Sequence, residues 1–248
     1  MKQAVLRYLR QNSYIQMIPR AALIDMDGTL YDSMPSHARV WQTMMAEIGV
    51  DLPYEEFFRH EGRTGKATIN ILFNRAFGHD ASDEQVKRLY TRKTELFAAM
   101  PAVSPMPGAA QMLDFLKSVG TKRVLVTGSG QRSLINRLNA DYPGAFSSDL
   151  IITGPDVTHG KPDPEPYLAA MSLAGVHPWE SIVIENAPLG VEAGHRSKAF
   201  TIGVNTGPIS PDELWDAGAD IVFDSMQEFA DALPLLIYEF LTTLNNAN

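Results

Sequence analysis

The sequence predicts an α/β fold: a doubly wound parallel, Rossmann-like sheet with an all-helical cap inserted after the first strand. Short apolar segments alternate with helix-length segments, which favours a parallel sheet covered by helices on both faces. These apolar segments end in Gly, Thr, Asp, Glu or Asn, and such sheets bind ligands at the carboxyl ends of their strands. The segment after the first strand has helical periodicity and no strand pattern.

The first strand is expected at the start of AALIDMDGTLYD, residues 21–32. The other expected strands lie within residues 123–130, 149–156, 181–188 and 199–207. Helices are expected between them at QRSLINRLNA, PEPYLAAMSLAG and LGVEAGHRS. We therefore assign residues 1–32 and 105–248 to the core domain and residues 33–104 to the cap domain.

The cap segment contains three stretches with a helical pattern, SHARVWQTMMAEIG, TGKATINILFNRAFG and SDEQVKRLYTRKTELFAAM. Ser82 and Gln85 have the spacing of a capping box at the start of the third. The first 20 residues indicate a short amphipathic helix on the surface. Leucines and aromatic residues recur at helical spacing near LPLLIYEFL, which predicts a C-terminal helix packed on the core.

Composition narrows the classes of protein that this chain can form. The chain has 248 residues, no cysteine and a formal net charge of −8. A broad nucleic-acid surface would need a basic face, so nucleic acid is not an expected partner. No apolar run approaches the roughly 20 residues of a membrane helix, and the start lacks a secretory signal. We expect a cytoplasmic protein, monomeric, without a membrane partner.

Asp25 and Asp27 stand two positions apart where the first strand ends. Side chains alternate along a strand, so the two carboxylates are expected to share one side. Two like charges at close range cost free energy unless a cation neutralises them or one keeps its proton. A solvated acidic turn is the alternative, and these residues alone do not decide between the two.

Four motifs in order resemble those of the haloacid dehalogenase-like superfamily of phosphotransferases. They are Asp25 to Leu30, Thr127 at the end of a second strand, Lys161 in HGKPDPEPY, and IENAPLGVEAG. They span almost the whole chain, from about residue 20 to 225. The position of the helical insert resembles the cap of the β-phosphoglucomutase-like branch.

The resemblance implies a role for each motif residue. Asp25 would attack phosphorus and form an aspartyl-phosphate, while Asp27 would be the general acid/base and offer its backbone carbonyl to Mg²⁺. Thr127 and the turn at Gly128 and Ser129 would bind the phosphoryl oxygens. Lys161 would stabilise the charge on the nucleophile and on those oxygens. Taken singly, a threonine at a strand end and a lysine before prolines also fit a turn and a solvated surface.

The fourth motif departs from the pattern of the family, because Glu185 is followed by Asn186 where a second acidic residue is usual. Asparagine keeps an oxygen ligand but carries no charge. Glu61, in the cap segment RHEGRTGKATIN, is placed where the specificity loop of this branch faces the active site. We therefore predict a Mg²⁺ site formed by Asp25, Asp27, Glu185 and Asn186, and completed by Glu61 when the cap closes.

A small anionic phosphate compound is the expected substrate, and these features resemble the inorganic pyrophosphatases of the branch. The mutases use a cap arginine to bind the distal phosphate of a sugar, and the matching position here is Gly65 or a neighbour. The cap residues that could contact the substrate are His37, Arg63, Arg92 and Lys93. The alternatives are a β-phosphoglucomutase, a broad sugar-phosphate phosphatase, and a phosphate-binding module without catalysis.

Overall fold

The computed structural model describes residues 1–129 and 132–245, and its centre is a six-stranded parallel sheet. The strand order is β5-β4-β1-β6-β7-β8. The strands are β1 (Ala21–Ile24), β4 (Lys122–Val126), β5 (Ile151–Ile152), β6 (Ser181–Glu185), β7 (Phe200–Val204) and β8 (Ile221–Phe223). This order confirms the predicted doubly wound fold, and β1 lies at the point where the winding reverses.

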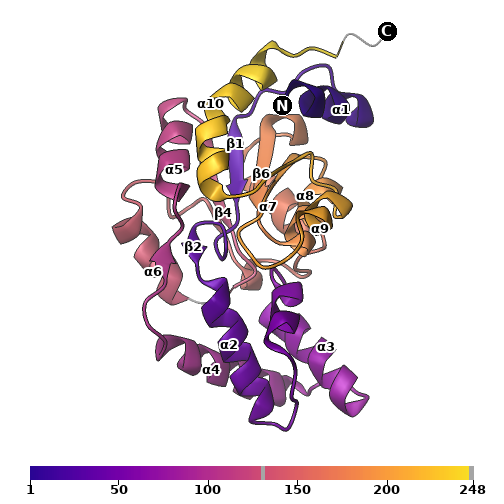
Figure 1. Cartoon of the computed structure of the whole chain (residues 1–248), viewed down its shortest axis with the longest axis vertical. Coiled ribbons are helices and arrows are strands. Elements are labelled where there is room, and N and C mark those ends of the chain that lie inside the picture. Colours follow the sequence, from indigo (N-terminus) through magenta and orange to yellow (C-terminus); the bar gives the residue numbers. More distant parts are fainter. Residues whose placement is uncertain (130–131, 246–248) are drawn as a thin grey trace.

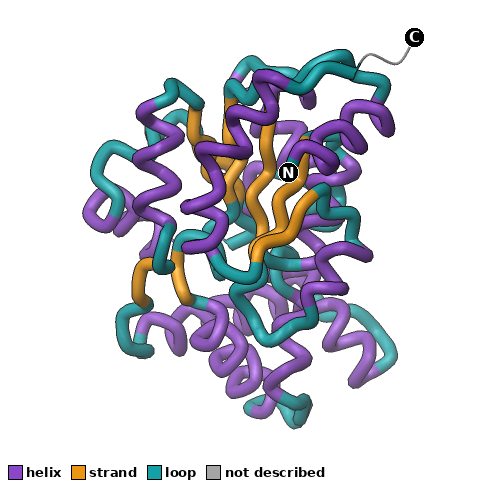
Figure 2. The backbone as a smooth tube through the Cα atoms, turned by 45° about the horizontal axis from the view of Figure 1, so that its top comes forward, coloured by secondary structure: helices purple, strands orange, loops and turns teal. Residues whose placement is uncertain are grey.

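The sheet separates two helical layers (Figure 2). Ala22 and Ile24 of β1 face one layer, whereas Ala21 and Leu23 face the other, as alternation in a strand requires. The first layer contains α1 (Lys2–Asn12), α5 (Ala109–Ser118), α6 (Arg132–Asp141) and α10 (Met226–Thr242). The second contains α7 (Glu165–Ala174) and α8 (Pro188–Arg196), and α9 (Pro211–Asp216) packs beside α8. Among the described residues, no helix is long and apolar enough to cross a membrane.

The structure agrees with most of the expected elements and adds several. Gly130 and Gln131, which end one expected strand segment and begin one expected helix, lie outside the described residues. Strand β8 and helices α5 and α9 were not among the predicted elements. Helix α9 has six residues and β8 has three, and β8 is only partly buried at the sheet edge, so both carry little hydrophobic pattern, whereas α5 is as long as α6 and α7.

Residues 33–104, which we call the cap, lie below the carboxyl end of the sheet in Figure 1. They form α2 (Met34–Ala46), a 3-10 helix (Tyr54–His60), α3 (Gly65–Phe77) and α4 (Asp83–Ala98) around an apolar core of their own. The predicted capping box of Ser82 and Gln85 is present at the start of α4. Two short strands, β2 (Tyr31–Asp32) and β3 (Ser104–Pro105), pair antiparallel where the chain enters and leaves the cap.

The expectation of no strand in the cap segment was therefore wrong at its end. A two-residue strand is too short to show alternation. It forms because the outgoing and returning chains run side by side, with Tyr31 opposite Pro105. The paired segments connect the cap to the core at two adjacent points.

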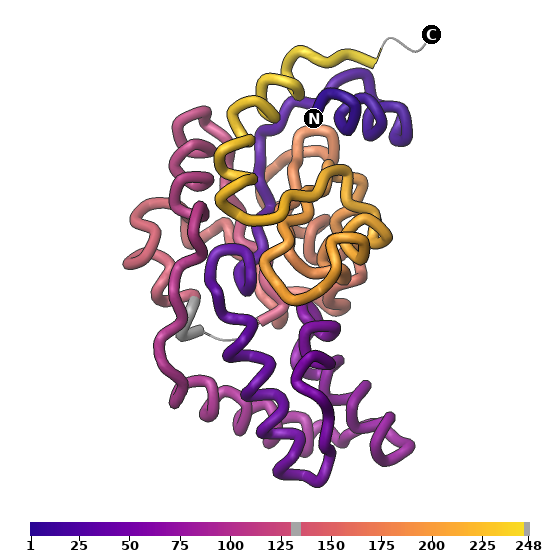
Figure 3. Tube along the Cα trace, viewed as in Figure 1, coloured from indigo at the N-terminus to yellow at the C-terminus, as the bar shows by residue number. Residues whose placement is uncertain are grey.

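Helices α1 and α10 lie next to each other at the end of the core opposite the cap (Figure 3). Helix α1 buries Val5, Tyr8 and Leu9 completely or almost completely. The Tyr8 hydroxyl donates a hydrogen bond to the carbonyl of Lys198 at 2.9 Å, and the N–H of Asn245 donates to the carbonyl of Ile15 at 2.8 Å. The N-terminal helix is thus an integral part of one helical layer, beyond the surface position expected from its sequence.

Asp220 is a buried carboxylic acid in this region, where its Oδ2 accepts a hydrogen bond from the N–H of Thr201 at 2.8 Å. Burial raises the pKa of Asp220 to about 7, although that hydrogen bond and Arg7 oppose the shift. The native state therefore keeps a proton that the unfolded chain loses near pH 4. The free energy of unfolding should fall as the pH rises from about 4 to about 7.

We predict that Asp220→Asn removes this part of the pH dependence. Between pH 5 and pH 8, chemical denaturation should show the wild type losing about 3 kcal/mol relative to the variant, because pH 5 lies about two units below the native pKa and one unit corresponds to about 1.4 kcal/mol. Asp216→Asn, at an exposed position of α9, is the control and should track the wild type. Parallel profiles for wild type and Asp220→Asn would contradict the prediction.

Candidate active site

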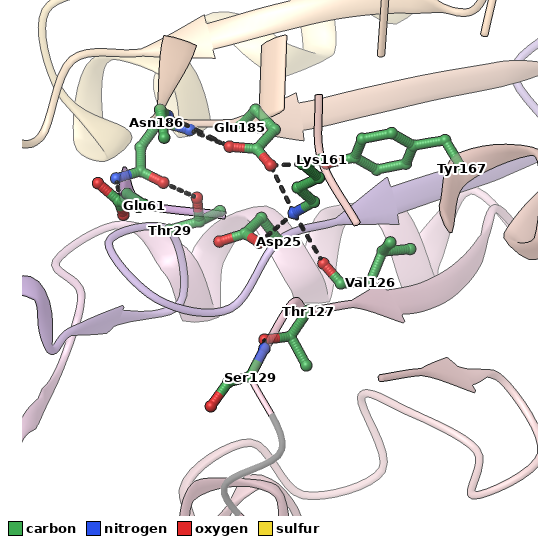
Figure 4. A network of polar contacts seen from close by, with 11 residues as sticks. Asp25, Thr29, Glu61, Val126, Thr127, Ser129, Lys161, Tyr167, Glu185 and Asn186 are labelled. Atoms are coloured by element: carbon green, nitrogen blue, oxygen red, sulfur yellow. Dashed lines mark hydrogen bonds and ion pairs between the residues drawn. The ribbon is translucent and has the colours of Figure 1, made fainter. Parts of the chain in front are cut away.

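Lys161 is the central charge of the candidate active site, at the carboxyl ends of β1, β4 and β6 (Figure 4). Its Nζ donates to Asp25 Oδ1 at 2.5 Å, to Glu185 Oε1 at 2.6 Å and to the carbonyl of Val126 at 3.1 Å. Lys161 and both carboxylates are almost fully buried. Burial by itself would lower the pKa of Lys161, but the two carboxylates outweigh it and raise that pKa, so the ammonium stays charged.

Glu185 is held from several sides. The Tyr167 hydroxyl donates to its Oε1 at 2.7 Å, and the N–H groups of Asn186 and Ala187 donate to its Oε2 at 3.0 and 3.2 Å. Both oxygens therefore already accept hydrogen bonds. In this geometry Glu185 orients Lys161, and its predicted role as a metal ligand stays a prediction.

Asp25 follows β1 directly, and its N–H still donates to the carbonyl of Ile184 in β6 at 3.1 Å. Burial raises the pKa of its carboxyl well above the usual value, and Glu185 and Asp27 add to the shift, while Lys161 opposes it. Asp25 therefore needs a further positive charge nearby to favour its ionised form, or else it keeps a proton.

One carboxylate oxygen of Asp27 is in hydrogen-bond contact with two residues near the start of the cap. Ser33 Oγ donates to Asp27 Oδ1 at 2.6 Å, and His37 Nε2 lies 3.0 Å from the same atom. Lys93 Nζ lies 3.0 Å from His37 Nδ1. An ammonium can only donate, so Nδ1 accepts, and the proton of a neutral His37 is on Nε2, where it points to Asp27. Lys93, His37 and Asp27 thus form a buried chain of hydrogen bonds.

The pKa values of this chain follow from burial and from the neighbouring charges. Burial would raise the pKa of Asp27, but His37, Ser33 and the charge of Lys93 outweigh it and lower that pKa. The pKa of His37 is lowered by burial and by Lys93. Burial also lowers the pKa of Lys93 to about 8. Near neutral pH the arrangement favours an ionised Asp27 beside a neutral histidine and a charged lysine.

Glu61 crosses from the cap to the core. Asn186 Nδ2 donates to Glu61 Oε1 at 2.7 Å, and Thr29 Oγ1 donates to Asn186 Oδ1 at 3.2 Å. A Cβ added to Gly28 would lie 2.0 Å from Asn186 Nδ2 and 2.8 Å from Glu61 Oε1, and Gly28 has a φ of +77°. The turn after Asp27 therefore needs glycine for both its backbone angle and its contacts. Burial raises the pKa of Glu61 well above its usual value, and Asp25 adds to the shift.

The turn after β4 faces the same cap loop. Thr127 is buried, and its Oγ1 accepts the N–H of Ser129 at 3.0 Å. A Cβ on Gly128 would lie 2.5 Å from the carbonyl oxygen of Gly62, so the cap loop rests directly on this turn. The predicted phosphoryl-binding residues therefore lie under the loop that carries Glu61.

The buried charges fit a divalent cation. Four carboxyl groups, those of Asp25, Asp27, Glu61 and Glu185, lie near two lysines, Lys93 and Lys161. Burial raises the pKa values of Asp25 and Glu61, so a nearby cation would favour their ionised forms. Among the described residues, no three His, Cys, Asp or Glu side chains converge as around a metal ion. The predicted ligand set, however, includes the Asp27 carbonyl and the Asn186 amide, whose oxygen and nitrogen positions can exchange by a flip of the side chain.

A cavity of about 60 Å³ lies between cap and core. Its core side includes Asp25, Asp27, Thr127, Gly128 and Ser129. Its cap side contains both predicted and unpredicted residues: Met34, His37, Trp41, Phe57, His60, Glu61, Gly62, Arg63, Gly65, Thr68, Tyr90 and Lys93. The structure therefore brings most of the predicted site residues to one small cavity, although Lys161, Glu185 and Asn186 do not line it.

One predicted contact is wrong, and the unpredicted cavity residues include the polar side chains of Tyr90 and His60. Arg92 is exposed and makes a two-point ion pair with Glu47 at 2.9 and 2.6 Å, because it lies on the outer face of α4 next to buried Lys93. Tyr90 stands three positions before Lys93 on the same helical face, so helical spacing from Lys93 could have indicated it. His60 precedes Glu61, but nothing in its local pattern distinguishes it.

Comparison with known proteins agrees with this fold. The family model for haloacid dehalogenase-like hydrolases matches residues 19–198. Hexitol phosphatase A of Escherichia coli (strain K12) is 30% identical over 76% of this chain and 84% of its own length. Validoxylamine A 7'-phosphate phosphatase of Streptomyces hygroscopicus subsp. limoneus is 30% identical over 84% of this chain and 95% of its own.

A solved structure described as a putative beta-phosphoglucomutase from Bacteroides vulgatus is 46% identical and covers 96% of this chain and 97% of its own, with a TM-score of 0.93. The chain therefore belongs to the haloacid dehalogenase-like hydrolases, within their β-phosphoglucomutase-like branch. The names of these three proteins refer to phosphorylated sugars and similar compounds, and none refers to pyrophosphate. They give no support for the predicted closeness to inorganic pyrophosphatases.

We predict that Lys93→Met lowers kcat/KM for phosphate hydrolysis by about 10- to 100-fold. The methionine keeps the bulk but loses a charge-assisted hydrogen bond, which typically contributes 1.5–3 kcal/mol. The wild type should also lose activity as the pH rises through about 8, because Lys93 loses its proton there, and Lys93→Arg should move this limit upward.

The matched control for this experiment is the neighbouring exposed residue. Arg92→Met should stay within about twofold of the wild type, since Arg92 contacts Glu47 outside the cavity. If Arg92→Met and Lys93→Met change kcat/KM by the same factor, the hydrogen-bond chain from Lys93 to Asp27 has no specific part in activity.

Proposed function

We propose that this protein is a Mg²⁺-dependent phosphohydrolase that cleaves inorganic pyrophosphate through an aspartyl-phosphate on Asp25. The observation that carries this proposal is the position of Glu61, which reaches Asn186 in the core from a loop that rests on the phosphoryl-binding turn. With the cap in this position, little room is left for a leaving group.

The size of the cavity supports a very small substrate. Sites for drug-sized ligands usually measure about 300–1,000 Å³, whereas this cavity measures about 60 Å³. A Cβ on Gly65 would lie 2.1 Å from the ring of Tyr90, so Tyr90 fills the space that a side chain at position 65 would take. The position expected to carry the sugar-binding arginine of a mutase is thus closed by an aromatic ring.

Asp25 and Lys161 perform the first step of the proposed reaction. Lys161 holds Asp25 Oδ1, and the other carboxylate oxygen would attack one phosphorus of pyrophosphate. A bond forms between that oxygen and phosphorus while the bridging P–O bond breaks, and its electron pair leaves with the second phosphate. Thr127 and the turn at Gly128 would bind the oxygens of the transferring group.

Asp27 would transfer the proton between water and the leaving phosphate. Ser33 and His37 both bind Oδ1, which leaves Oδ2 for proton transfer. In the second step the oxygen of water would bond to phosphorus while the bond between the Asp25 oxygen and phosphorus breaks, which restores the carboxylate. Ionised Asp27 would take the proton of the water. Asp27 then gives that proton to the leaving phosphate of the next turnover. Pyrophosphate brings no hydroxyl acceptor, so water must complete the reaction.

The residues that would hold Mg²⁺ are Asp25, the carbonyl of Asp27, Asn186 and Glu61. When bound, the ion supplies positive charge that offsets the clustered carboxylates and the charge on the transferring phosphoryl group. Because Glu61 belongs to the cap and Asn186 to the core, binding of the ion would favour the closed arrangement.

A sugar-phosphate phosphatase or a β-phosphoglucomutase is the second candidate. The names of the relatives favour it, since they include a hexitol phosphatase and a putative beta-phosphoglucomutase. A larger leaving group would then require the cap to open further than the contact between Gly62 and Gly128 allows.

The purified protein should be assayed with Mg²⁺ on pyrophosphate, hexitol phosphates, 2-deoxyglucose-6-phosphate, and β-glucose-1-phosphate with a bisphosphate primer. We expect the highest kcat/KM on pyrophosphate. Asp25→Asn, which keeps the shape but not the nucleophile, serves as the blank for contaminating phosphatases. Fast sugar isomerisation, or comparable rates on many esters with weak pyrophosphate cleavage, would overturn the proposal.

Glu61→Ala should weaken the dependence of turnover on Mg²⁺. We expect the Mg²⁺ concentration for half-maximal rate to rise by about tenfold or more, since a buried charged ligand is removed. Glu55→Ala, at an exposed position of the 3-10 helix that ends just before Glu61, should leave this Mg²⁺ concentration unchanged. An unaltered Mg²⁺ dependence in Glu61→Ala would remove the cap ligand from the proposal.

Tyr90→Ala should widen the range of substrates. Removing the ring next to Gly65 opens room in the cap, so kcat/KM for sugar phosphates should rise relative to that for pyrophosphate by about tenfold. Tyr238→Ala on α10, whose side chain is exposed and far from the cap, is the control. If the ratio stays the same in both variants, Tyr90 does not limit the size of the substrate.

A further inference from the structure

His60 is a polar side chain of the cavity that the proposed mechanism does not use. It ends the 3-10 helix of the cap and lines the cavity, with its side chain only 12% exposed. Within the described residues, neither of its ring nitrogens makes a hydrogen bond. Buried polar groups are normally paired, so an unpaired imidazole at a substrate cavity needs an explanation.

The nearest acidic neighbour does not provide one. His60 Nε2 lies 3.6 Å from Glu56 Oε1, which is beyond hydrogen-bond distance. That same oxygen already accepts a hydrogen bond from Arg75 at 2.8 Å. Arg63, on the following loop, also has a buried Nε without a partner among the described residues. Two donors on one segment of the cap are therefore available to a ligand.

The position of His60 indicates that it would contact the leaving group of a substrate. The transferring phosphoryl group must face Asp25, Thr127 and the turn after β4, all on the core side of the cavity. The leaving group then lies toward the cap, where His60 stands immediately before Glu61. An imidazole keeps at least one N–H donor whether neutral or charged, and hydrogen bonds to anionic oxygens are strong.

We propose that His60 donates a hydrogen bond to the leaving phosphate and so selects substrates whose leaving group carries phosphate oxygens. This inference rests on the proposed function. It adds a residue that recognises the substrate from the cap, separate from the metal site and from the proton transfer at Asp27.

The test compares two substrates that share the transferring phosphoryl group. The leaving group of pyrophosphate is phosphate. The leaving group of acetyl phosphate is acetate, which offers no phosphate oxygen to the cap. In His60→Leu we expect KM for pyrophosphate to rise about tenfold or more, because one charge-assisted hydrogen bond is lost. The rate with acetyl phosphate should change less than about twofold. His60→Asn retains an N–H donor and should recover part of the affinity.

His79→Leu is the matched control, since His79 is an exposed histidine of the same cap. Thermal unfolding of each variant checks folding, and if His60→Leu fails to fold, His60→Asn and His60→Gln carry the comparison. Calorimetric titration with methylenediphosphonate, a non-hydrolysable analogue, in the presence of Mg²⁺ measures binding without turnover. It should show the same loss of affinity in His60→Leu.

The outcomes separate the two claims. Wild-type protein without pyrophosphatase activity overturns the proposed function and this inference with it. Active wild type with unchanged KM in His60→Leu overturns the inference alone. Equal losses on pyrophosphate and acetyl phosphate would show that His60 supports the cap or the reacting group, and would also overturn it.

Discussion

The buried ammonium of Lys161 is the interaction on which the site depends. It joins Asp25 at the end of β1, Glu185 at the end of β6 and the carbonyl of Val126 at the end of β4, so one charge ties three adjacent strands together. Lys161 opposes the effect of burial, which raises the pKa of Asp25. The parallel sheet makes this arrangement possible, because it brings the ends of all three strands to one edge. Asp25, the proposed nucleophile, is thereby held at the end of the central strand.

The cap adds a second set of charges to this fixed centre. Glu61 brings a carboxylate to Asn186, while Lys93 and His37 reach Asp27 through hydrogen bonds. The sequence has Asn186 where a second acidic residue was expected after Glu185, and Glu61 of the cap places its carboxylate against that amide. The loop that carries Glu61 also rests on Gly128 and lines the cavity, so its position affects both the buried charge and the size of the cavity.

Local pattern was enough for most strands and helices and for the residues at the strand ends. Asp25 and Thr127 could be placed in advance because each follows an apolar segment, and the ends of parallel strands meet at one edge. Lys161 lies in a polar, proline-rich segment and was placed only through the resemblance to the family. The short elements β2, β3 and β8 escaped prediction, since two or three residues carry no periodicity. The sequence did not show which of the adjacent residues Arg92 and Lys93 faces the cavity. Only the packing of α4 decides which one is buried.

The sequence by itself determined the doubly wound sheet, the helical insert and the chemical identity of the core site, because periodicity, strand-end residues and motif spacing are local properties of the chain. The tertiary structure decided how the cap meets that site. The contact of Glu61 with Asn186 depends on how the cap packs on the core, whereas the ring of Tyr90 against Gly65 and the surroundings of His60 depend on packing within the cap. No local pattern encodes either arrangement, since both result from side-chain contacts between residues that lie apart in the chain.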